Sequence, residues 1–255
     1  MATFYGVNNS DPTVRNISGI VADSSLRLYF DAGRTASYPG TGYTWSDLSG
    51  NGSTITFYKE GGATYSSYQA GPPVFDTSRM GEFIFDGVND WAKLSADFTG
   101  GSTQTFSAWV KFTGAGTMGL LSHYSGGPVN VCYQVSGGKM SYYYYTSSWQ
   151  TATGITSVNT GTWKHLTWTK NGTAMVMYIN GASDLSTTLT GDIGGNFGCV
   201  GTNWGPGNSV SYGAGTDTYG MVFGGSIGMV MYYNKALTAA EVLQNYNATK
   251  SRFGL

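Results

Sequence analysis

The residues that could catalyse hydrolysis in this chain are its three glutamates, Glu60, Glu82 and Glu241, which lie far apart in the sequence. Retaining hydrolysis of a glycosidic bond needs two carboxyl groups roughly 5 Å apart, one as nucleophile and one as acid. On a single strand, such a pair appears as two acidic residues two positions apart, and no predicted strand carries a glutamate in that arrangement. The sequence therefore predicts a protein that is not an enzyme.

The two histidines, His123 and His165, do not indicate a metal centre. Neither has a cysteine or a carboxylate neighbour at the spacing of metal ligands. The chain also lacks a phosphate-binding Gly-Lys-Ser/Thr loop. We expect His165, which lies between Lys164 and Leu166, to be a structural residue.

Asp47, Asp86 and Asp90 are the candidate metal ligands. Calcium binds hard oxygen atoms from aspartate carboxylates and loop carbonyls, and the segments around these residues could supply both. The alternative is that Asp47 and Asp86 cap turns by accepting hydrogen bonds from nearby backbone amides. Turn capping is the commoner role, so calcium is a candidate cofactor and capping is the preferred interpretation.

Aromatic residues in polar, glycine-rich segments are the candidates for ligand binding, because an aromatic ring face stacks on the C–H groups of a sugar. Two segments have this character, the tyrosine run 142–145 with the tryptophan that follows it, and the loop 203–212. Side chains alternate along a strand, so only one pair of the four tyrosines can face outward. The predicted carbohydrate or partner surface consists of Tyr142, Tyr144, Trp149, Trp204 and Tyr212.

Three other tryptophans, Trp109, Trp163 and Trp168, are expected to pack inside the protein, because tryptophan is usually well buried. Trp109 is the least obvious of them. It lies opposite Phe106, Ala108 and Val110 on the nominally polar face of its strand.

The composition is that of strands and turns. The 255 residues include 39 glycines, 19 tyrosines and 12 phenylalanines, and only 11% are charged, which is too few charges for extended helices. The net charge is −1, with lysines and arginines scattered singly, so we expect no nucleic-acid partner. No apolar run approaches the roughly 18 residues of a membrane span. The polar first ten residues do not resemble a signal peptide.

Period-two alternation of apolar residues recurs from about residue 26 to residue 233, with glycine-containing turns between the runs. Asn171-Gly172, for example, separates two such runs and predicts a tight hairpin. A single short helix is marked near the carboxyl terminus by Thr238 and Glu241, which form a capping box. Leu237 and Val242 occupy the hydrophobic staple positions beside it. These signals predict an all-β sandwich with one C-terminal helix.

Four segments in order resemble the laminin-G-like, or concanavalin A-like lectin/glucanase, superfamily. They are the opening segment Leu26–Gly52, the FIFDGVNDW segment Phe83–Trp91, the FSAWVK strand Phe106–Lys111 with Gly161–Gly181, and the closing strand and helix Gly225–Tyr246. The resemblance implies a jelly-roll sandwich of two antiparallel sheets. We assign residues 23–255 to this domain and residues 1–22 to a polar amino-terminal arm.

The resemblance also bears on calcium. Many relatives carry an aspartate in the closing strand that helps to hold the ion, and Gly228 stands at the matching position here. The resemblance therefore does not imply the family calcium site for this chain.

The opening segment is most similar to versions carried by virion proteins of tailed phages. This similarity leads to the hypothesis of a non-enzymatic virion structural protein, a capsid decoration or a tail or fibre appendage, made in the host cytoplasm without a signal peptide. Its expected partners are other virion proteins, through homo-oligomer or lattice contacts, and host-surface glycans. The alternative is a free-standing carbohydrate-binding module or adhesin.

Overall fold

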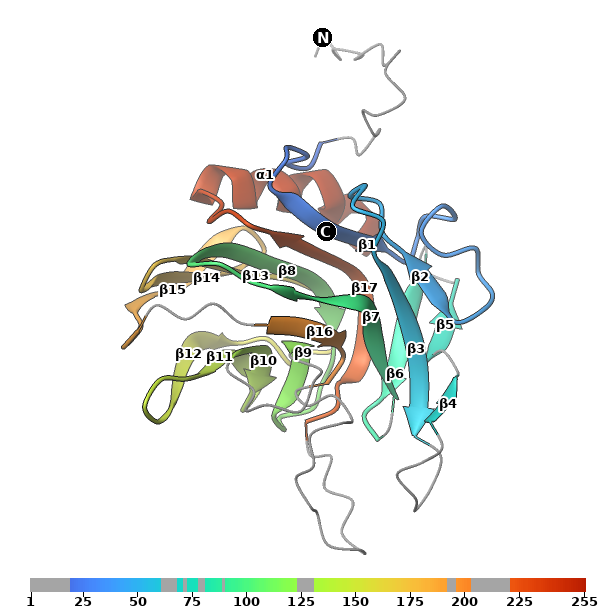
Figure 1. Cartoon of the computed structure of the whole chain (residues 1–255), viewed down its shortest axis with the longest axis horizontal. Coiled ribbons are helices and arrows are strands. Elements are labelled where there is room, and N and C mark those ends of the chain that lie inside the picture. Colours follow the sequence, from blue (N-terminus) through green and yellow to red (C-terminus); the bar gives the residue numbers. More distant parts are fainter. Residues whose placement is uncertain are drawn as a thin grey trace, which may run out of the picture.

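The period-two runs form antiparallel strands that assemble into two stacked sheets (Figure 1). The structure, a computed structural model, describes residues 19–60, 68–70, 73–77, 81–88, 90–122, 131–191, 196–202 and 221–255. The predicted β-sandwich with one short C-terminal helix is confirmed.

We call the first layer sheet A. In spatial order its strands are β15 (Ala182–Thr188), β14 (Ala174–Ile179), β13 (Lys164–Asn171), β8 (Thr103–Lys111), β17 (Gly224–Tyr233), β6 (Glu82–Asp86) and β5 (Val74–Asp76), and β1 (Leu26–Asp31) also pairs with β17. The hairpin predicted at Asn171-Gly172 joins β13 to β14, where Asn171 pairs with Ala174.

We call the second layer sheet B. In spatial order its strands are β12 (Trp149–Ser157), β11 (Lys139–Tyr145), β10 (Val131–Ser136), β9 (Met118–Ser122), β16 (Asn196–Val200), β7 (Asp90–Thr99), β3 (Thr54–Glu60) and β2 (Thr44–Ser46), and β4 (Tyr68–Ala70) pairs with β3. The edge strand β12 and its neighbour β11 are central to the sections below.

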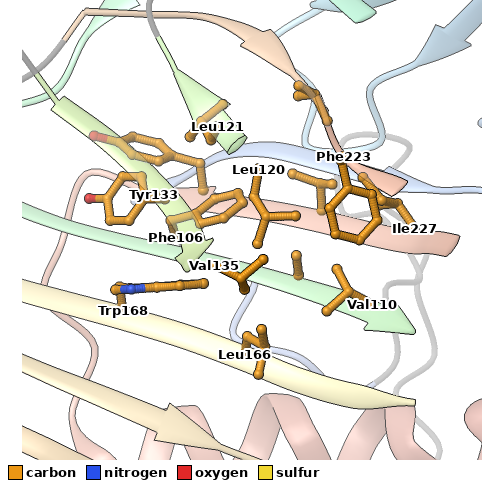
Figure 2. Close-up of a cluster of buried hydrophobic side chains, with 14 of the residues drawn as sticks. Phe106, Val110, Leu120, Leu121, Tyr133, Val135, Leu166, Trp168, Phe223 and Ile227 are labelled. Atoms are coloured by element: carbon orange, nitrogen blue, oxygen red, sulfur yellow. The ribbon is translucent and has the colours of Figure 1, made fainter. Parts of the chain in front are cut away.

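The main core fills the space between the two sheets. Figure 2 shows it as side chains that reach toward one another from both layers: Phe106, Val110, Leu166 and Trp168 of sheet A, and Leu120, Leu121, Tyr133 and Val135 of sheet B. All of these side chains are almost completely buried. Apolar burial on this scale is the dominant favourable contribution to folding.

A second apolar layer covers the outer face of sheet A. The helix α1 (Ala239–Thr249) lies over this face (Figure 1). The 3₁₀ turn η1 (Lys250–Phe253) packs in the same layer through Phe253. Trp109 stacks on Phe253 with 4.2 Å between ring centroids, and its Nε1 donates to Oγ1 of Thr249 at 2.8 Å. The predicted packing role of Trp109 is thereby confirmed, and so are those of Trp163 and Trp168, which are buried.

The helix begins as predicted. The Thr238 side chain accepts from the Glu241 amide, and the Glu241 carboxylate accepts from the Thr238 amide at 2.8 Å. Leu237 and Val242 are both buried in the layer beneath the helix.

Two residues of the predicted arm contact the domain. Ile20 and Val21 are buried in the layer under α1, and the Val21 amide donates to Oδ1 of Asn245 at 2.8 Å. Ile20 and Val21, which the sequence assigns to the arm, are therefore packed on the domain. Residues 1–18 of the predicted arm lie outside the described residues.

Candidate functional site

Three aromatic side chains gather on the outer face of sheet B, on the edge strand β12 and its neighbour β11. They are Tyr143, Tyr145 and Trp149, and we call them the outer aromatic cluster. Trp149 and Tyr143 are stacked, with 4.5 Å between ring centroids and 3° between ring planes. Tyr145 meets Trp149 edge-on at 5.1 Å. Trp149 and Tyr145 remain 38% and 37% exposed, so the cluster presents aromatic surface to solvent.

Strand pairing explains why these three rings meet. Tyr145 lies directly opposite Trp149 in the β11–β12 ladder, and Tyr143 lies opposite Thr151, two residues further along. Tyr143 is therefore the diagonal neighbour of Trp149 on the same face, within reach of a long aromatic side chain.

The predicted pair Tyr142 and Tyr144 faces the other way. Both are buried in the inter-sheet core, 0% and 3% exposed, so the choice of the outward pair was wrong. The neighbouring Met140 carried the signal that could have corrected it. Met140 is apolar, shares the face of Tyr142 and Tyr144, and is completely buried. Side chains alternate along β11, and the face that carries Met140 is the buried one, so Tyr142 and Tyr144 point inward and Tyr143 and Tyr145 point outward.

The cluster is bordered by neutral polar groups. Thr151 lies exposed beside Tyr143 on the outer face of β12. Thr153, two residues further along β12, is exposed on the same face. Partial burial raises the pKa of the Tyr143 hydroxyl, which is protonated at neutral pH as in any ordinary tyrosine. Stacked rings with neighbouring hydroxyls can bind an uncharged, hydroxyl-rich ligand such as a sugar.

Two further predicted surface residues, Trp204 and Tyr212, lie outside the described residues, as does His123. Their role in ligand binding stays a prediction.

The candidate calcium ligands separate into two places. Oδ1 of Asp47 accepts from the amides of Tyr29 and Ser49, each at 2.8 Å, which is the turn-capping role. Oδ1 of Asp86 accepts from the Val88 amide at 2.8 Å, and the Asp86 amide donates to Oδ2 of Asp90 at 3.0 Å.

Among the described residues, no three His, Cys, Asp or Glu side chains form a group that could hold a metal ion. Asp86 and Asp90 are thus brought together, and Asp47 is engaged elsewhere.

Two of the three glutamates are engaged in structural contacts. The Glu82 carboxylate is buried and forms an ion pair with Nζ of Lys111 at 2.9 Å. Glu241 caps α1 and pairs with Lys235. The side chain of Glu60 lies outside the described part of the chain.

Residues 224–228 read Gly-Gly-Ser-Ile-Gly, which is the spacing of a serine nucleophile elbow and which sequence reasoning missed. A nucleophile elbow requires a sharp turn from a strand into a helix. Ser226 lies instead inside β17, paired with Ile84 and Lys111 on the neighbouring strands, and is buried. The segment is therefore part of a strand and not a nucleophile elbow.

His165 is buried under the helix, as its predicted structural role requires. Its Nε2 lies 2.7 Å from the Ser107 hydroxyl, and its ring packs beside Trp109. Burial lowers the pKa of His165 to about 3, so the ring is neutral at physiological pH.

Comparison with known families agrees with the architecture. A laminin-G family model, described as the concanavalin A-like lectin/glucanases superfamily, matches residues 86–243. This match covers well over half of the chain. The chain belongs to the concanavalin A-like lectin/glucanase superfamily. No curated protein sequence matches it.

Several solved structures share this superfamily fold at low sequence identity. One is domain 4 of an extracellular GH43 arabinanase from Geobacillus stearothermophilus, in complex with arabinotriose, with 20% identity and a TM-score of 0.59 over 87% of this chain and 98% of that one. Another is the binding domain of Paraclostridial Mosquitocidal Protein 1, with 14% identity and a TM-score of 0.56 over 88% and 52%.

A third is the binding domain of botulinum neurotoxin DC in complex with SialylT, with 11% identity and a TM-score of 0.56 over 89% and 52%. The chain thus spans about half the length of the toxin binding domains. At these identities the likeness shows the fold alone. In the part of the chain that the structure describes, no helix is long and apolar enough to cross a membrane.

Proposed function

We propose that this lectin-like domain is a non-catalytic glycan-binding module and that the outer aromatic cluster is its sugar-contacting surface. One observation carries the proposal, namely the parallel stack of Trp149 on Tyr143 on the outer face of sheet B. The stack holds the indole in a fixed orientation, with 38% of the residue exposed. A rigid, partly exposed ring loses little conformational freedom on binding, which favours affinity.

The chemistry of the surface matches a neutral sugar. Apolar C–H groups of a pyranose or furanose can stack on the exposed aromatic surface, while the hydroxyls of the sugar bond to neighbouring hydroxyl groups. The strand β12 carries no charged side chain, so a charged ligand gains no ion pair there. The described helical elements, α1 and η1, both pack on sheet A and leave this face of sheet B uncovered by helices.

The solved relatives support this proposal by analogy of fold. The arabinanase domain was determined with arabinotriose bound, and a neurotoxin binding domain was determined with SialylT. A third relative comes from botulinum neurotoxin type C, whose cell entry is described as dependent upon interaction with two ganglioside molecules. The non-catalytic part of the proposal is supported by Glu82 and Glu241, whose carboxylates are held in an ion pair and a helix cap.

A glycan array probed with the labelled wild type, Trp149→Ala and Tyr43→Ala tests the proposal. Tyr43 is the matched control, because it is an exposed aromatic residue, 51% accessible, outside the cluster. We expect binding by the wild type and by Tyr43→Ala, and none by Trp149→Ala. Equal binding by all three proteins would place any glycan site elsewhere, with Trp204 and Tyr212 as the next residues to substitute.

We further propose that the domain acts in the virion of a tailed phage, as a capsid decoration or a tail or fibre appendage that contacts host-surface glycans. This part rests on the similarity of the opening segment Leu26–Gly52 to versions carried by phage virion proteins. The expected partners are neighbouring virion subunits. Mass spectrometry of purified particles tests the assignment. Absence of the chain from the particles contradicts it and leaves a free-standing carbohydrate-binding module or adhesin.

A further inference from the structure

The outer aromatic cluster depends on an irregularity in β12. Ser141 of β11 pairs with Thr153, and Lys139 of β11 pairs with Ser157. Between these two pairs β11 advances two residues, from 141 to 139, while β12 advances four, from 153 to 157. The strand β12 therefore carries two extra residues at this point, which form a β-bulge. A bulge bends its strand and interrupts the ladder, and bulges are over-represented next to functional sites, where they re-aim a side chain.

The bulge decides where Trp149 lies. A regular ladder continued from residues 139 and 157 would place Tyr143 opposite Thr153. Trp149 would then lie four strand positions from the partner of Tyr143, roughly 13 Å away, and the two rings would not stack. With the bulge, Trp149 is the diagonal neighbour of Tyr143, with 4.5 Å between the ring centroids.

The alternation of apolar residues does not select between these two registers. They differ by two residues, and a shift by an even number leaves the same side chains on the outer face. A further contact is therefore needed to fix the register of β12.

A carboxylate from the opposite sheet supplies that contact. Asp184 of β15 accepts from the amides of Ile155 and Thr156, at 2.8 Å and 3.0 Å. Residues 154–156 form the bulge and are left out of the ladder with β11, so the carboxylate takes the place of an acceptor on that strand. Gly154 permits the approach, because a Cβ at residue 154 would lie 2.5 Å from Oδ2 of Asp184.

The two ends of β12 differ in how firmly they are held. Val158, directly after the strand, is completely buried, and its amide donates to the carbonyl oxygen of Gly138 at 2.7 Å. At the other end, Ser147 and Ser148 lie exposed in the three-residue loop 146–148 between β11 and β12. Hairpin loops of up to five residues are common, so this loop can lengthen by two. Loss of the bulge would therefore slide residues 149–153 along β11 and leave residue 157 in place.

We propose that Asp184 is a positioning residue for the outer aromatic cluster. By holding the bulge of β12 from the opposite sheet, it sets the register that brings Trp149 onto Tyr143. The meaning of this role for ligand binding rests on the proposed glycan-binding function. The register itself can be measured without a glycan, so the two proposals can fail separately.

Calorimetric titration tests the effect on binding, with the glycan that the wild type binds best on the array. Asp184→Ala leaves all three rings of the cluster unchanged in sequence, yet we expect it to bind at least about tenfold more weakly, as removal of the stacked ring itself would. Ser186→Ala, an exposed position on the same strand β15, is the matched control and should bind as the wild type does. Wild-type affinity in Asp184→Ala overturns the proposal.

Gly154→Ala tests the same contact with Asp184 left in place. The added methyl group would meet Oδ2 of Asp184 at 2.5 Å, whereas its contacts with Met140, at 3.4 Å and 3.5 Å, are ordinary. The carboxylate must therefore move away from the bulge, and we expect the same loss of affinity as in Asp184→Ala. Unchanged affinity in Gly154→Ala contradicts the proposal.

Backbone nuclear Overhauser effects between β11 and β12 measure the register in the absence of glycan. The wild type should show the cross-strand pairs Ser141 with Thr153 and Tyr143 with Thr151. In Asp184→Ala these pairs should weaken, and Tyr143 with Thr153 should appear. Persistence of the wild-type pairs in Asp184→Ala overturns the proposal, whatever the binding result. If Asp184→Ala does not fold, the same measurement on Gly154→Ala decides.

A two-residue deletion provides a test that a merely stabilising role would not pass. Deletion of Gly154 and Ile155 removes the extra residues and restores a regular ladder with Trp149 still opposite Tyr145. Asp184 then has no bulge to hold, so Asp184→Ala in this background should change the glycan affinity by less than about twofold. An equal loss of affinity in the deleted and the full-length chain shows that Asp184 acts by another route and overturns the proposal. If the deleted chain does not fold, the register measurement decides alone.

Discussion

The indole of Trp149 lies parallel to the phenol of Tyr143, 4.5 Å away between ring centroids. This diagonal pair exists because β11 and β12 are adjacent and antiparallel, with Tyr143 opposite Thr151. One residue earlier, Tyr142 points into the core instead. Four consecutive tyrosines therefore serve two purposes, and single substitutions should separate them.

Tyr142→Ala should mainly lower the unfolding free energy, whereas Tyr143→Ala should mainly weaken glycan binding. Tyr142 is completely buried, and truncation of a large buried aromatic residue costs about 3–5 kcal/mol of unfolding free energy. Tyr143 is only half-buried, so its removal should cost about 1 kcal/mol or less while weakening glycan binding, because Trp149 loses its stacking partner. Urea denaturation and glycan titration of both variants provide the measurement. A strongly destabilised Tyr143→Ala with intact binding would show that the alternation is misassigned.

Arg252 fastens the carboxyl-terminal turn to sheet A. Its guanidinium forms an ion pair with the buried Asp31 carboxylate and donates to the carbonyl oxygens of Gly81, at 2.6 Å, and Gly228, at 3.3 Å. Arg252→Met removes all three contacts and leaves a buried carboxylate, so we expect a loss of about 3–5 kcal/mol in unfolding free energy.

Arg252→Lys is the informative comparison for this contact. It keeps the charge but lacks the planar guanidinium that reaches three acceptors, and it should recover only part of the loss. Thermal and urea unfolding of the three proteins measure this. Unchanged stability of Arg252→Met would contradict the fastening role.

His165 should make the domain sensitive to acid. Its folded-state pKa of about 3 lies below the ordinary value of 6.5, so the unfolded chain binds the proton more tightly. The contribution of His165 is therefore fully present above about pH 6.5 and is lost as the pH falls toward 3, at about 1.4 kcal/mol per pH unit.

Urea denaturation at pH 7 and pH 4.5, for the wild type and His165→Gln, isolates this effect from that of the carboxylates. Between these two pH values the wild type should lose about 3 kcal/mol more than the variant. Equal losses in the two proteins would show that His165 is not titrating from a buried neutral state.

Calcium removal should leave the stability of the turn at Asp47 unchanged. Oδ1 of Asp47 already accepts hydrogen bonds from two backbone amides, so the carboxylate has hydrogen-bond partners without a metal ion. We expect EDTA to leave the melting temperature unaltered, and Asp47→Ala to cost about 1–3 kcal/mol through the orphaned Tyr29 amide. Heat released on calcium titration of the stripped protein, abolished in Asp47→Ala, would instead make Asp47 a ligand.

Local signals in the sequence predicted local structure well. The helix start is an example, because Thr238 and Glu241 are three residues apart and each satisfies the backbone of the other. The inward phase of Tyr142 also follows from the apolar Met140 on the same face, whereas the prediction that Tyr142 and Tyr144 face outward is wrong.

Contacts between distant segments could not be read in the same way. The Arg252–Asp31 pair joins residues 221 positions apart, and Asp184 reaches from one sheet to the amides of the other. No local sequence pattern around these residues predicts which distant residue each will contact, because only the folded topology brings them together.

The most direct test of the central proposal is calorimetric titration of the best array glycan into the wild type, Trp149→Phe and Trp149→Ala. The outer aromatic cluster predicts that Trp149→Ala binds at least about tenfold more weakly, as loss of ~1.4 kcal/mol of stacking would produce, and that Trp149→Phe retains part of the affinity. Identical dissociation constants for the three proteins would contradict the assignment of sugar binding to this face of the sandwich.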